Sequence, residues 1–287
     1  MSATANSAAT ANMAATANSP AAAASVTIIE QGRVGGIGDV GRGAGKPAAG
    51  AGGGGAAVTR SDVLEHHWKF DSSGTDDTGN GATLTLTNGA TYDTTNKKFG
   101  AASLVLDGLD DYAHNDGGLT AISGAYTLSY WLRLTTLPGP TLSGLVGIQV
   151  TDTPDWDVGL VQLQHGSKIR YYHIKTSGYA ASAPAAGTLT VDEWAFVAQT
   201  WDEDSDEFKV YLGKHTDDDP ILLATVGSVT TVKAGLDSIV IGYGDFGGGN
   251  YNAGQWDDMR IYTEALSLDD LKLIYSGSTG GPRSGDY

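Results

Sequence analysis

Aromatic side chains beside polar residues are the feature of this sequence that points to a ligand, because a flat ring can stack on the C–H face of a sugar. One group lies in the glycine-rich loop 242–254, a second at 152–157 and a third at 171–179. Packing in a hydrophobic core or at its rim is the competing interpretation, since large aromatic residues are mostly buried. The candidate ligand-binding residues are Tyr243, Phe246, Tyr251 and Trp156.

Motifs for catalysis and cofactor binding find little support in the chain. It has no cysteine, its six histidines lack a metal-binding spacing such as H-E-x-x-H, and no G-x-S-x-G nucleophile motif occurs. Residues 36–41 match G-x-G-x-x-G, but Pro47 and a run of glycines follow them. The helix that a dinucleotide site requires cannot begin there, so we interpret the segment as a short strand and a glycine linker.

Charged and aromatic residues are distributed unevenly along the 287 residues. The formal net charge of −16 disfavours nucleic acid and anionic membrane lipid as partners, because both would be repelled. Residues 1–60 contain 18 alanines, 12 glycines and no aromatic residue, and their net charge is +2. Residues 61–287 hold all 24 aromatic residues and a net charge of −18, so only this part has the side chains for a core.

Residues 1–60 are predicted to be an extended arm and linker. Ala-Thr-Ala-Asn recurs at 3–6, 9–12 and 15–18, a period that keeps one face in an extended chain but not in an α-helix. A disordered tail is one interpretation, and an arm that becomes ordered on a partner is the other. The sequence shows neither a secretory signal peptide nor a membrane span, so we expect assembly in a cytoplasm.

Residues 61–276 are predicted to be nearly all strand. Residues 126–134 (YTLSYWLRL) alternate with period two, and turn residues separate similar runs. These runs are 101–107, 156–164, 168–174, 194–201, 207–213, 221–226, 237–243 and 255–263. Many short strands predict an all-β antiparallel sandwich or barrel. A capping box at 267–270 predicts one short C-terminal helix, and residues 277–287 are predicted to be a flexible tail.

The order of these segments resembles the laminin G-like, concanavalin A-like lectin/glucanase jelly-roll modules over residues 62–276. The resemblance is carried by 64–71 (LEHHWKFD), 76–81 (DDTGNG), 99–108 (FGAASLVLDG), 127–132 (TLSYWL), 193–198 (EWAFVA) and 255–262 (QWDDMRIY). It implies an antiparallel jelly-roll β-sandwich. It does not specify the ligand, since the fold hosts lectins, adhesion modules and glycosidases.

The resemblance also implies a structural calcium ion. Its expected ligands are Asp76, Asp77, Asn80, Asp257 and Asp258. Calcium binds six to eight oxygens, and a Gly/Asn turn exposes backbone carbonyls well. Neighbouring residues of a strand face opposite sides, so we expect one of the last two aspartates to be a ligand and the other to be solvated. Turn capping by Asp and Asn without any metal is the alternative.

An enzyme is not the expected function. Glycosidases of the resembled fold use a Glu-x-Asp-x-x-Glu strand, and the nearest run here, 202–207, has the wrong spacing and fits a solvated acidic turn. The resemblance places the tryptophans at 68, 131, 194 and 256 in the core rather than on a ligand platform.

The function predicted first is a virion surface protein, such as a bacteriophage capsid decoration or a head or tail component. Its arm would lie on neighbouring subunits, as a homo-oligomer or within a capsid, and its acidic jelly roll would project outward. The alternative is a glycan-binding module of a cell-surface or exported protein. A glycosidase is the least favoured interpretation. The predicted location is the virion, assembled in a host cytoplasm, with the cell surface as the alternative.

Overall fold

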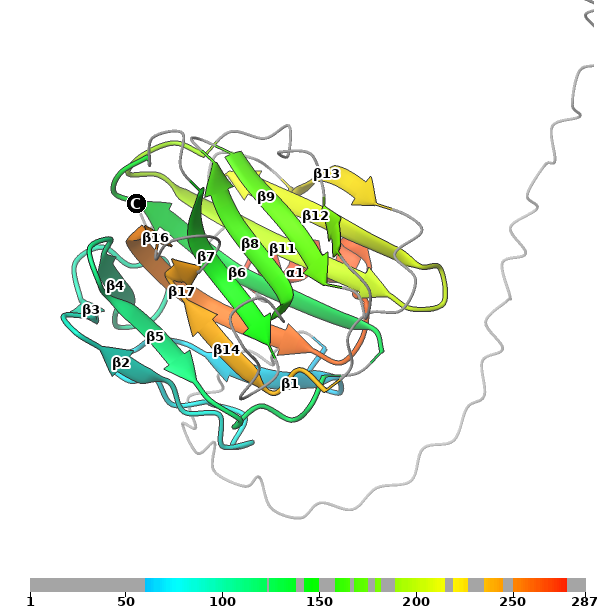
Figure 1. The fold of residues 1–287 in the computed structure, drawn as a ribbon, viewed down its shortest axis with the longest axis horizontal. Helices are drawn as coiled ribbons and strands as arrows, with labels where there is room; N and C mark the ends of the chain where they lie inside the picture. The colour runs from blue at the N-terminus through cyan, green and yellow to red at the C-terminus, as the bar shows by residue number, and fades with distance from the viewer. Residues whose placement is uncertain are drawn as a thin grey trace, which may run out of the picture. The chain divides into compact units, whose positions relative to one another are not determined.

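The computed structural model describes residues 60–122, 124–137, 142–149, 158–165, 168–174, 179–181, 189–214, 219–226, 235–244 and 250–277. These residues form two large antiparallel sheets that lie face to face, a two-stranded hairpin and one short helix (Figure 1). The predicted jelly-roll sandwich is thereby confirmed. The predicted arm lies outside the described residues except for Arg60. The described residues contain no helix with the length and apolar character of a membrane span.

The eight-stranded sheet is organised around β17. Its order is β13-β12-β11-β6-β17-β4-β3, and β17 pairs with β4 and then with β1 along one edge. The strands are β1 (Leu64–Trp68), β3 (Thr91–Asp93), β4 (Ser103–Asp107), β6 (Tyr126–Leu134), β11 (Trp194–Asp202), β12 (Glu207–Lys214), β13 (Ile221–Val226) and β17 (Ala253–Tyr262).

The seven-stranded sheet has the order β10-β9-β8-β7-β14-β5-β2. Its strands are β2 (Thr85–Thr87), β5 (Tyr112–Asn115), β7 (Leu142–Gln149), β8 (Val158–His165), β9 (Lys168–Ile174), β10 (Tyr179–Ala181) and β14 (Ser238–Ile241). The hairpin of β15 (Tyr243–Gly244) and β16 (Asn250–Tyr251) follows β14 and leads into β17. It therefore connects the two sheets.

Both faces of the central strand β6 are buried. The side chains that were predicted to share one face lie in the core between the sheets, as expected. They are Tyr126, Leu128, Tyr130, Leu132 and Leu134. A second apolar cluster covers the opposite face, where Trp131 packs with Phe196 and Tyr275. Trp68 and Trp256 are fully buried as predicted, whereas Trp194 is only partly buried.

The second cluster exists because the helix α1 (Leu268–Tyr275) lies on the outer face of the eight-stranded sheet. The Ser267 hydroxyl accepts a hydrogen bond from the Asp270 backbone N–H, and the Asp270 carboxylate accepts one from the Ser267 backbone N–H. This confirms the predicted capping box. Leu271 and Ile274 are the fully buried side chains of the helix, so its apolar stripe faces the sheet.

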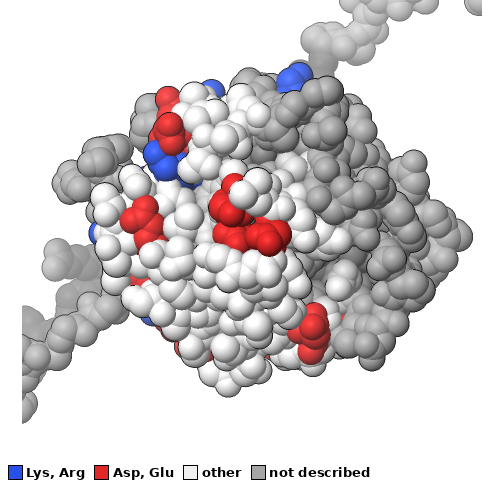
Figure 2. All heavy atoms as spheres, turned by 60° about the vertical axis from the view of Figure 1, so that its left-hand side comes forward, with Lys and Arg blue, Asp and Glu red and all other residues white. Residues whose placement is uncertain are grey.

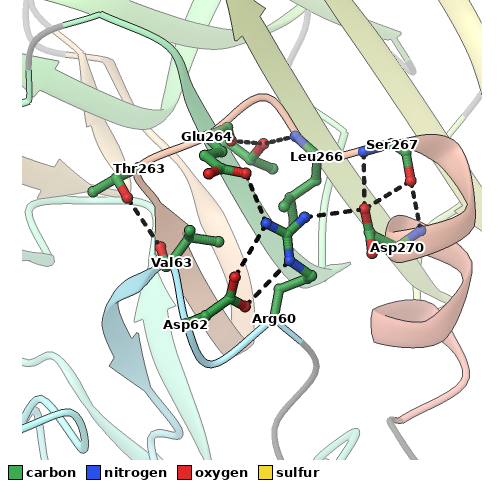
Figure 3. A network of polar contacts seen from close by, with 9 residues as sticks. Arg60, Asp62, Val63, Thr263, Glu264, Leu266, Ser267 and Asp270 are labelled. Carbon is green, nitrogen blue, oxygen red and sulfur yellow. Dashed lines mark hydrogen bonds and ion pairs between the residues drawn. The ribbon is translucent and has the colours of Figure 1, made fainter.

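Arg60 ties the start of the described chain to the corner between β17 and α1 (Figure 3). Its guanidinium lies 2.7 Å from Glu264, 3.2 Å from Asp62 and 3.4 Å from Asp270. Hydrogen bonds to Glu264 and Asp62 raise the pKa of Arg60 above its ordinary value. Because water reaches these groups, the pairs orient the chain more than they stabilise the fold.

Charged side chains are buried where β1 pairs with β17. His67 Nε2 lies 2.7 Å from Asp258 Oδ1, and the same oxygen accepts a hydrogen bond from Arg260 Nη2 at 2.9 Å. Asp258 has a φ of 48° at an irregularity in the pairing of β17. Burial opposes ionisation of Asp258, but the charge of Arg260 and the hydrogen bond from His67 outweigh it and lower its pKa.

Asp76 and Asp257 are two further buried carboxylates, and their pKa values shift in opposite directions. Asp76 accepts hydrogen bonds from His66 Nδ1 at 2.7 Å and from the backbone N–H of His67 at 3.0 Å. Burial opposes its ionisation, but these bonds and those from Thr78 lower the pKa of Asp76 to about 2. Asp257 accepts two backbone N–H bonds, yet burial, aided by the charge of Asp258, raises its pKa well above the ordinary value.

The expectation that either Asp257 or Asp258 is solvated is wrong. Their exposed fractions are 0% and 6%. The backbone at 98–99 donates to Asp257, which faces away from the core, and Asp258 is bonded to His67 and Arg260, while Trp256 and Met259 fill the core on the inner face. Both faces of β17 are therefore covered, and a strand residue that points away from the core still finds protein rather than water.

We predict that Asp76→Asn destabilises the fold at neutral pH. The amide oxygen can keep the bonds from His67 and Thr78, but an NH2 group would replace the oxygen that faces His66 Nδ1, and the loss of this buried bond should lower the free energy of unfolding by about 1–3 kcal/mol. A lowered pKa contributes stability that is fully present above the unfolded value of 3.8 and is lost as the pH falls toward about 2. Urea unfolding should therefore show a difference between wild type and variant that shrinks over this acidic range.

Asp257→Asn is the matched comparison, and it should behave oppositely. The amide oxygen can still accept the two backbone N–H bonds, while the buried charge is removed. A raised pKa costs stability as the pH rises above 3.8, so the variant should be at least as stable as wild type at neutral pH. Equal destabilisation by both substitutions at neutral pH would contradict this assignment.

Candidate functional site

Three tyrosine rings lie together where β5 meets the β15–β16 hairpin. The ring centroids are 4.9 Å apart for Tyr243 and Tyr251, 5.8 Å for Tyr112 and Tyr243, and 6.4 Å for Tyr112 and Tyr251. The His114 ring lies 5.2 Å from Tyr112. All four side chains are partly exposed. We call these four residues the tyrosine cluster.

The strand pattern places this cluster on the outer face of the seven-stranded sheet. Ala113 of β5 is fully buried in the core, so its neighbours Tyr112 and His114 face outward. Tyr243 and Tyr251 are directly opposite each other in the hairpin, where cross-strand aromatic pairs are stabilising. His114 lies between a hydroxyl and a carboxylate, with Thr87 Oγ1 at 3.3 Å and Asp116 Oδ2 at 3.5 Å.

The hairpin rests directly on β7 because residue 144 has no side chain. A Cβ at Gly144 would lie 2.1 Å from the carbonyl carbon of Tyr243 and 2.2 Å from the nitrogen of Gly244. Hydrogen bonds secure the same contact: the Gly242 N–H donates to the Leu145 carbonyl at 2.9 Å, and Asn252 Nδ2 donates to Ser143 Oγ at 3.0 Å. The backbone that carries Tyr243 and Tyr251 is thus held against β7, and the rings then contact one another.

Residues 107–111, which are the last residue of β4 and the turn before β5, lead into Tyr112 of the tyrosine cluster. A Cβ at Gly108 would lie 2.7 Å from the Cβ of Ala253, two residues after Tyr251. Carboxylate oxygens of Asp107, Asp110 and Asp111 all lie within 4.8 Å of one another. We call residues 107–111 the acidic turn. Figure 2, which brings the side with β2 to β5 forward, shows one compact group of acidic side chains near the middle of this face and other, separate acidic and basic groups around it.

Two of the four predicted ligand-binding residues belong to the tyrosine cluster. Tyr243 and Tyr251 lie together, whereas Phe246 and Trp156 fall outside the described residues. Sequence reasoning missed Tyr112 and His114. The signal was present as an aromatic-small-aromatic alternation across Ala113, but this strand has only four residues and lies far from the hairpin in the sequence.

The five predicted calcium ligands do not converge in the structure. Asp76 is hydrogen-bonded to His66, and Asp258 is hydrogen-bonded to His67 and Arg260. Asp257 accepts hydrogen bonds from the backbone at 98–99, and Asp77 forms an ion pair with Lys69. Asn80 Nδ2 donates to the Glu65 carbonyl at 2.7 Å. Within the part of the chain that the structure describes, only the acidic turn brings ligand atoms of three Asp, Glu or His side chains within 4.8 Å of one another. The predicted set therefore does not fit one shared ion, and calcium binding stays a prediction.

Solved structures with this fold include toxin binding domains. The botulinum neurotoxin serotype D ligand-binding domain in complex with N-acetylneuraminic acid is 15% identical, with a TM-score of 0.56, over 75% of this chain and 51% of that chain. The binding domain of Paraclostridial Mosquitocidal Protein 1 is 12% identical, with a TM-score of 0.57, over 76% and 52%. The chain thus spans about half of these structures. At such identities the likeness shows the fold alone.

Comparison with curated proteins gave no match. A family model described as the concanavalin A-like lectin/glucanases superfamily, of the laminin G type, matches residues 107–272. The matched region runs from the acidic turn through the tyrosine cluster to α1 and covers more than half of the chain. The chain therefore belongs to the concanavalin A-like lectin/glucanases superfamily.

Proposed function

We propose that the domain is a non-enzymatic carbohydrate-binding module whose ligand stacks on the tyrosine cluster. The observation that carries the proposal is the mutual contact of three partly exposed tyrosine rings on an outer sheet face. Rings with an apolar body and a polar hydroxyl suit a sugar, which presents both C–H faces and hydroxyls. Close packing of the β15–β16 hairpin on Gly144 holds the backbone of Tyr243 in place before binding, which lowers the entropy cost of ordering this part of the site.

The surroundings of the cluster support the same proposal. The acidic turn offers carboxylate oxygens that can accept hydrogen bonds from sugar hydroxyls. The superfamily to which the chain belongs is described as one of lectins and glucanases. We assign no catalytic step. Asp257, the described carboxylate with a raised pKa, is fully buried and cannot reach a sugar, and the run at 203–206 forms a turn between β11 and β12.

The sequence also supports a proposal about residues 1–60 and a virion surface. We propose that residues 1–60 attach the domain to other subunits. Their six-residue repeat suits an extended arm, and their side chains are too small to form a hydrophobic core. A carbohydrate-binding module on a virion surface would satisfy both functions. Sedimentation of the full chain should show an oligomer or co-assembly with a capsid, and deletion of residues 3–18 should weaken it; a monomer in both cases would contradict attachment.

Removing the aromatic ring of a cluster tyrosine should weaken carbohydrate binding. We expect Tyr243→Ala and Tyr251→Ala each to raise the Kd for the best ligand of a glycan panel by roughly fivefold, which corresponds to about 1 kcal/mol of ring contact. Tyr243→Phe is the matched control, because it keeps the ring and should retain most of the affinity. Unchanged binding by both alanine variants would refute a site at this cluster.

Gly144→Ala should weaken binding without touching the ligand. The new methyl group would overlap the backbone of Tyr243 and Gly244, so the hairpin must move and the rings must separate. Amide NMR spectra should show the largest shifts at 242–252, and titration with the same glycan should show reduced affinity. A folded variant with wild-type affinity would mean that the hairpin position does not matter for binding.

A further inference from the structure

We infer that the acidic turn makes this carbohydrate site selective for neutral and amino sugars, against sugars that carry a carboxylate or a sulfate. The inference rests on the proposed function and concerns which sugars the same site accepts. It combines two features that are joined through the backbone: Asp111 of the acidic turn directly precedes Tyr112, and a Cβ at Gly242, next to Tyr243, would lie 3.6 Å from the Asp111 carbonyl oxygen.

The acidic turn is held in a defined shape. The Asp111 carboxylate is 3% exposed and accepts hydrogen bonds from the backbone N–H of Gly89 at 2.6 Å and of Asp107 at 3.1 Å. Asp107 accepts one from the N–H of Leu109 at 2.8 Å, and Asn88 Nδ2 donates to the Asp110 carbonyl at 2.6 Å. The turn therefore keeps its three carboxylates close together although they repel one another.

The negative charge of the turn is not cancelled locally. None of its three carboxylates forms an ion pair with a lysine or arginine that the structure describes. His114 of the tyrosine cluster lies beside a further carboxylate, that of Asp116. Asp107 and Asp110 are exposed, so their charges reach the solvent in which a ligand sits.

The negative charge of the acidic turn should change the affinity for a sugar in a direction that depends on the charge of that sugar. An anionic sugar on the tyrosine rings adds a like charge beside the turn, whereas a protonated amino sugar relieves the repulsion there. Exposed charges contribute modestly, so two carboxylates should change affinity by roughly threefold to tenfold. Salt should reduce the effect, because it screens exposed charges and leaves ring stacking unchanged.

The test uses the full chain and sets of glycans that share one backbone in neutral, amino and carboxylated or sulfated forms. Titration at low and high salt should give the order amino, neutral, anionic, with the differences reduced at high salt. The double variant Asp107→Asn/Asp110→Asn should bind the anionic forms threefold to tenfold more tightly than wild type does. Glu203→Gln/Asp204→Asn, in the turn between β11 and β12, is the matched control with the same change in net charge and should leave the order unchanged.

The outcomes separate this inference from the proposed function. Binding to no glycan of any charge would overturn both. Binding in which anionic forms equal or exceed neutral ones, or in which the double variant and the control behave alike, would overturn the inference and leave the carbohydrate site standing. Repeating the titration with a chelator supplies a further check, since a selectivity that changes on metal removal would mean that a cation in the turn, and not its free charge, sets the preference.

Discussion

The domain depends on the burial of β17 on both faces while the strand pairs with three others. Trp256, Met259 and Ile261 fill the core between the sheets, and the outer-facing Asp257 and Arg260 are covered as well. Burying charge is costly unless partners compensate it, and Arg260 and His67 do so for Asp258. Because β1 pairs with the end of β17, this compensated charge lies where the first and last strands of the sandwich meet.

The opposite end of β17 positions the candidate site. The β15–β16 hairpin leads directly into the strand, and Ala253 pairs with Asp107 at the start of the acidic turn. The pairing of β17 with β4 therefore determines the positions of Tyr251 and of the acidic turn. Because the turn leads into β5, it also determines the position of Tyr112. Gly144 then lets the hairpin lie on the seven-stranded sheet, so the tyrosine cluster is supported by that sheet rather than by a free loop.

Patterns that act within one element were predictable, and contacts between distant elements were not. The alternation at 126–134 gave the core face of β6, and the capping box gave the start of α1. Tyr243 and Tyr251 were selected from their glycine-rich loop, but Tyr112 was not, because only the β5–β14 pairing brings it near them. The pairing of Asp258 with His67 was equally invisible, since the irregularity in β17 that accompanies it follows from tertiary packing.

The central claim is that a carbohydrate stacks on the tyrosine cluster, and the most direct measurement is NMR of the full chain with carbon-13 in its tyrosine rings. Titration with a neutral or amino glycan that the protein binds should shift the ring signals of Tyr112, Tyr243 and Tyr251 together. The signals of buried tyrosines such as Tyr130 and Tyr262 should stay in place. Saturable binding that leaves the three cluster signals unmoved would contradict the account.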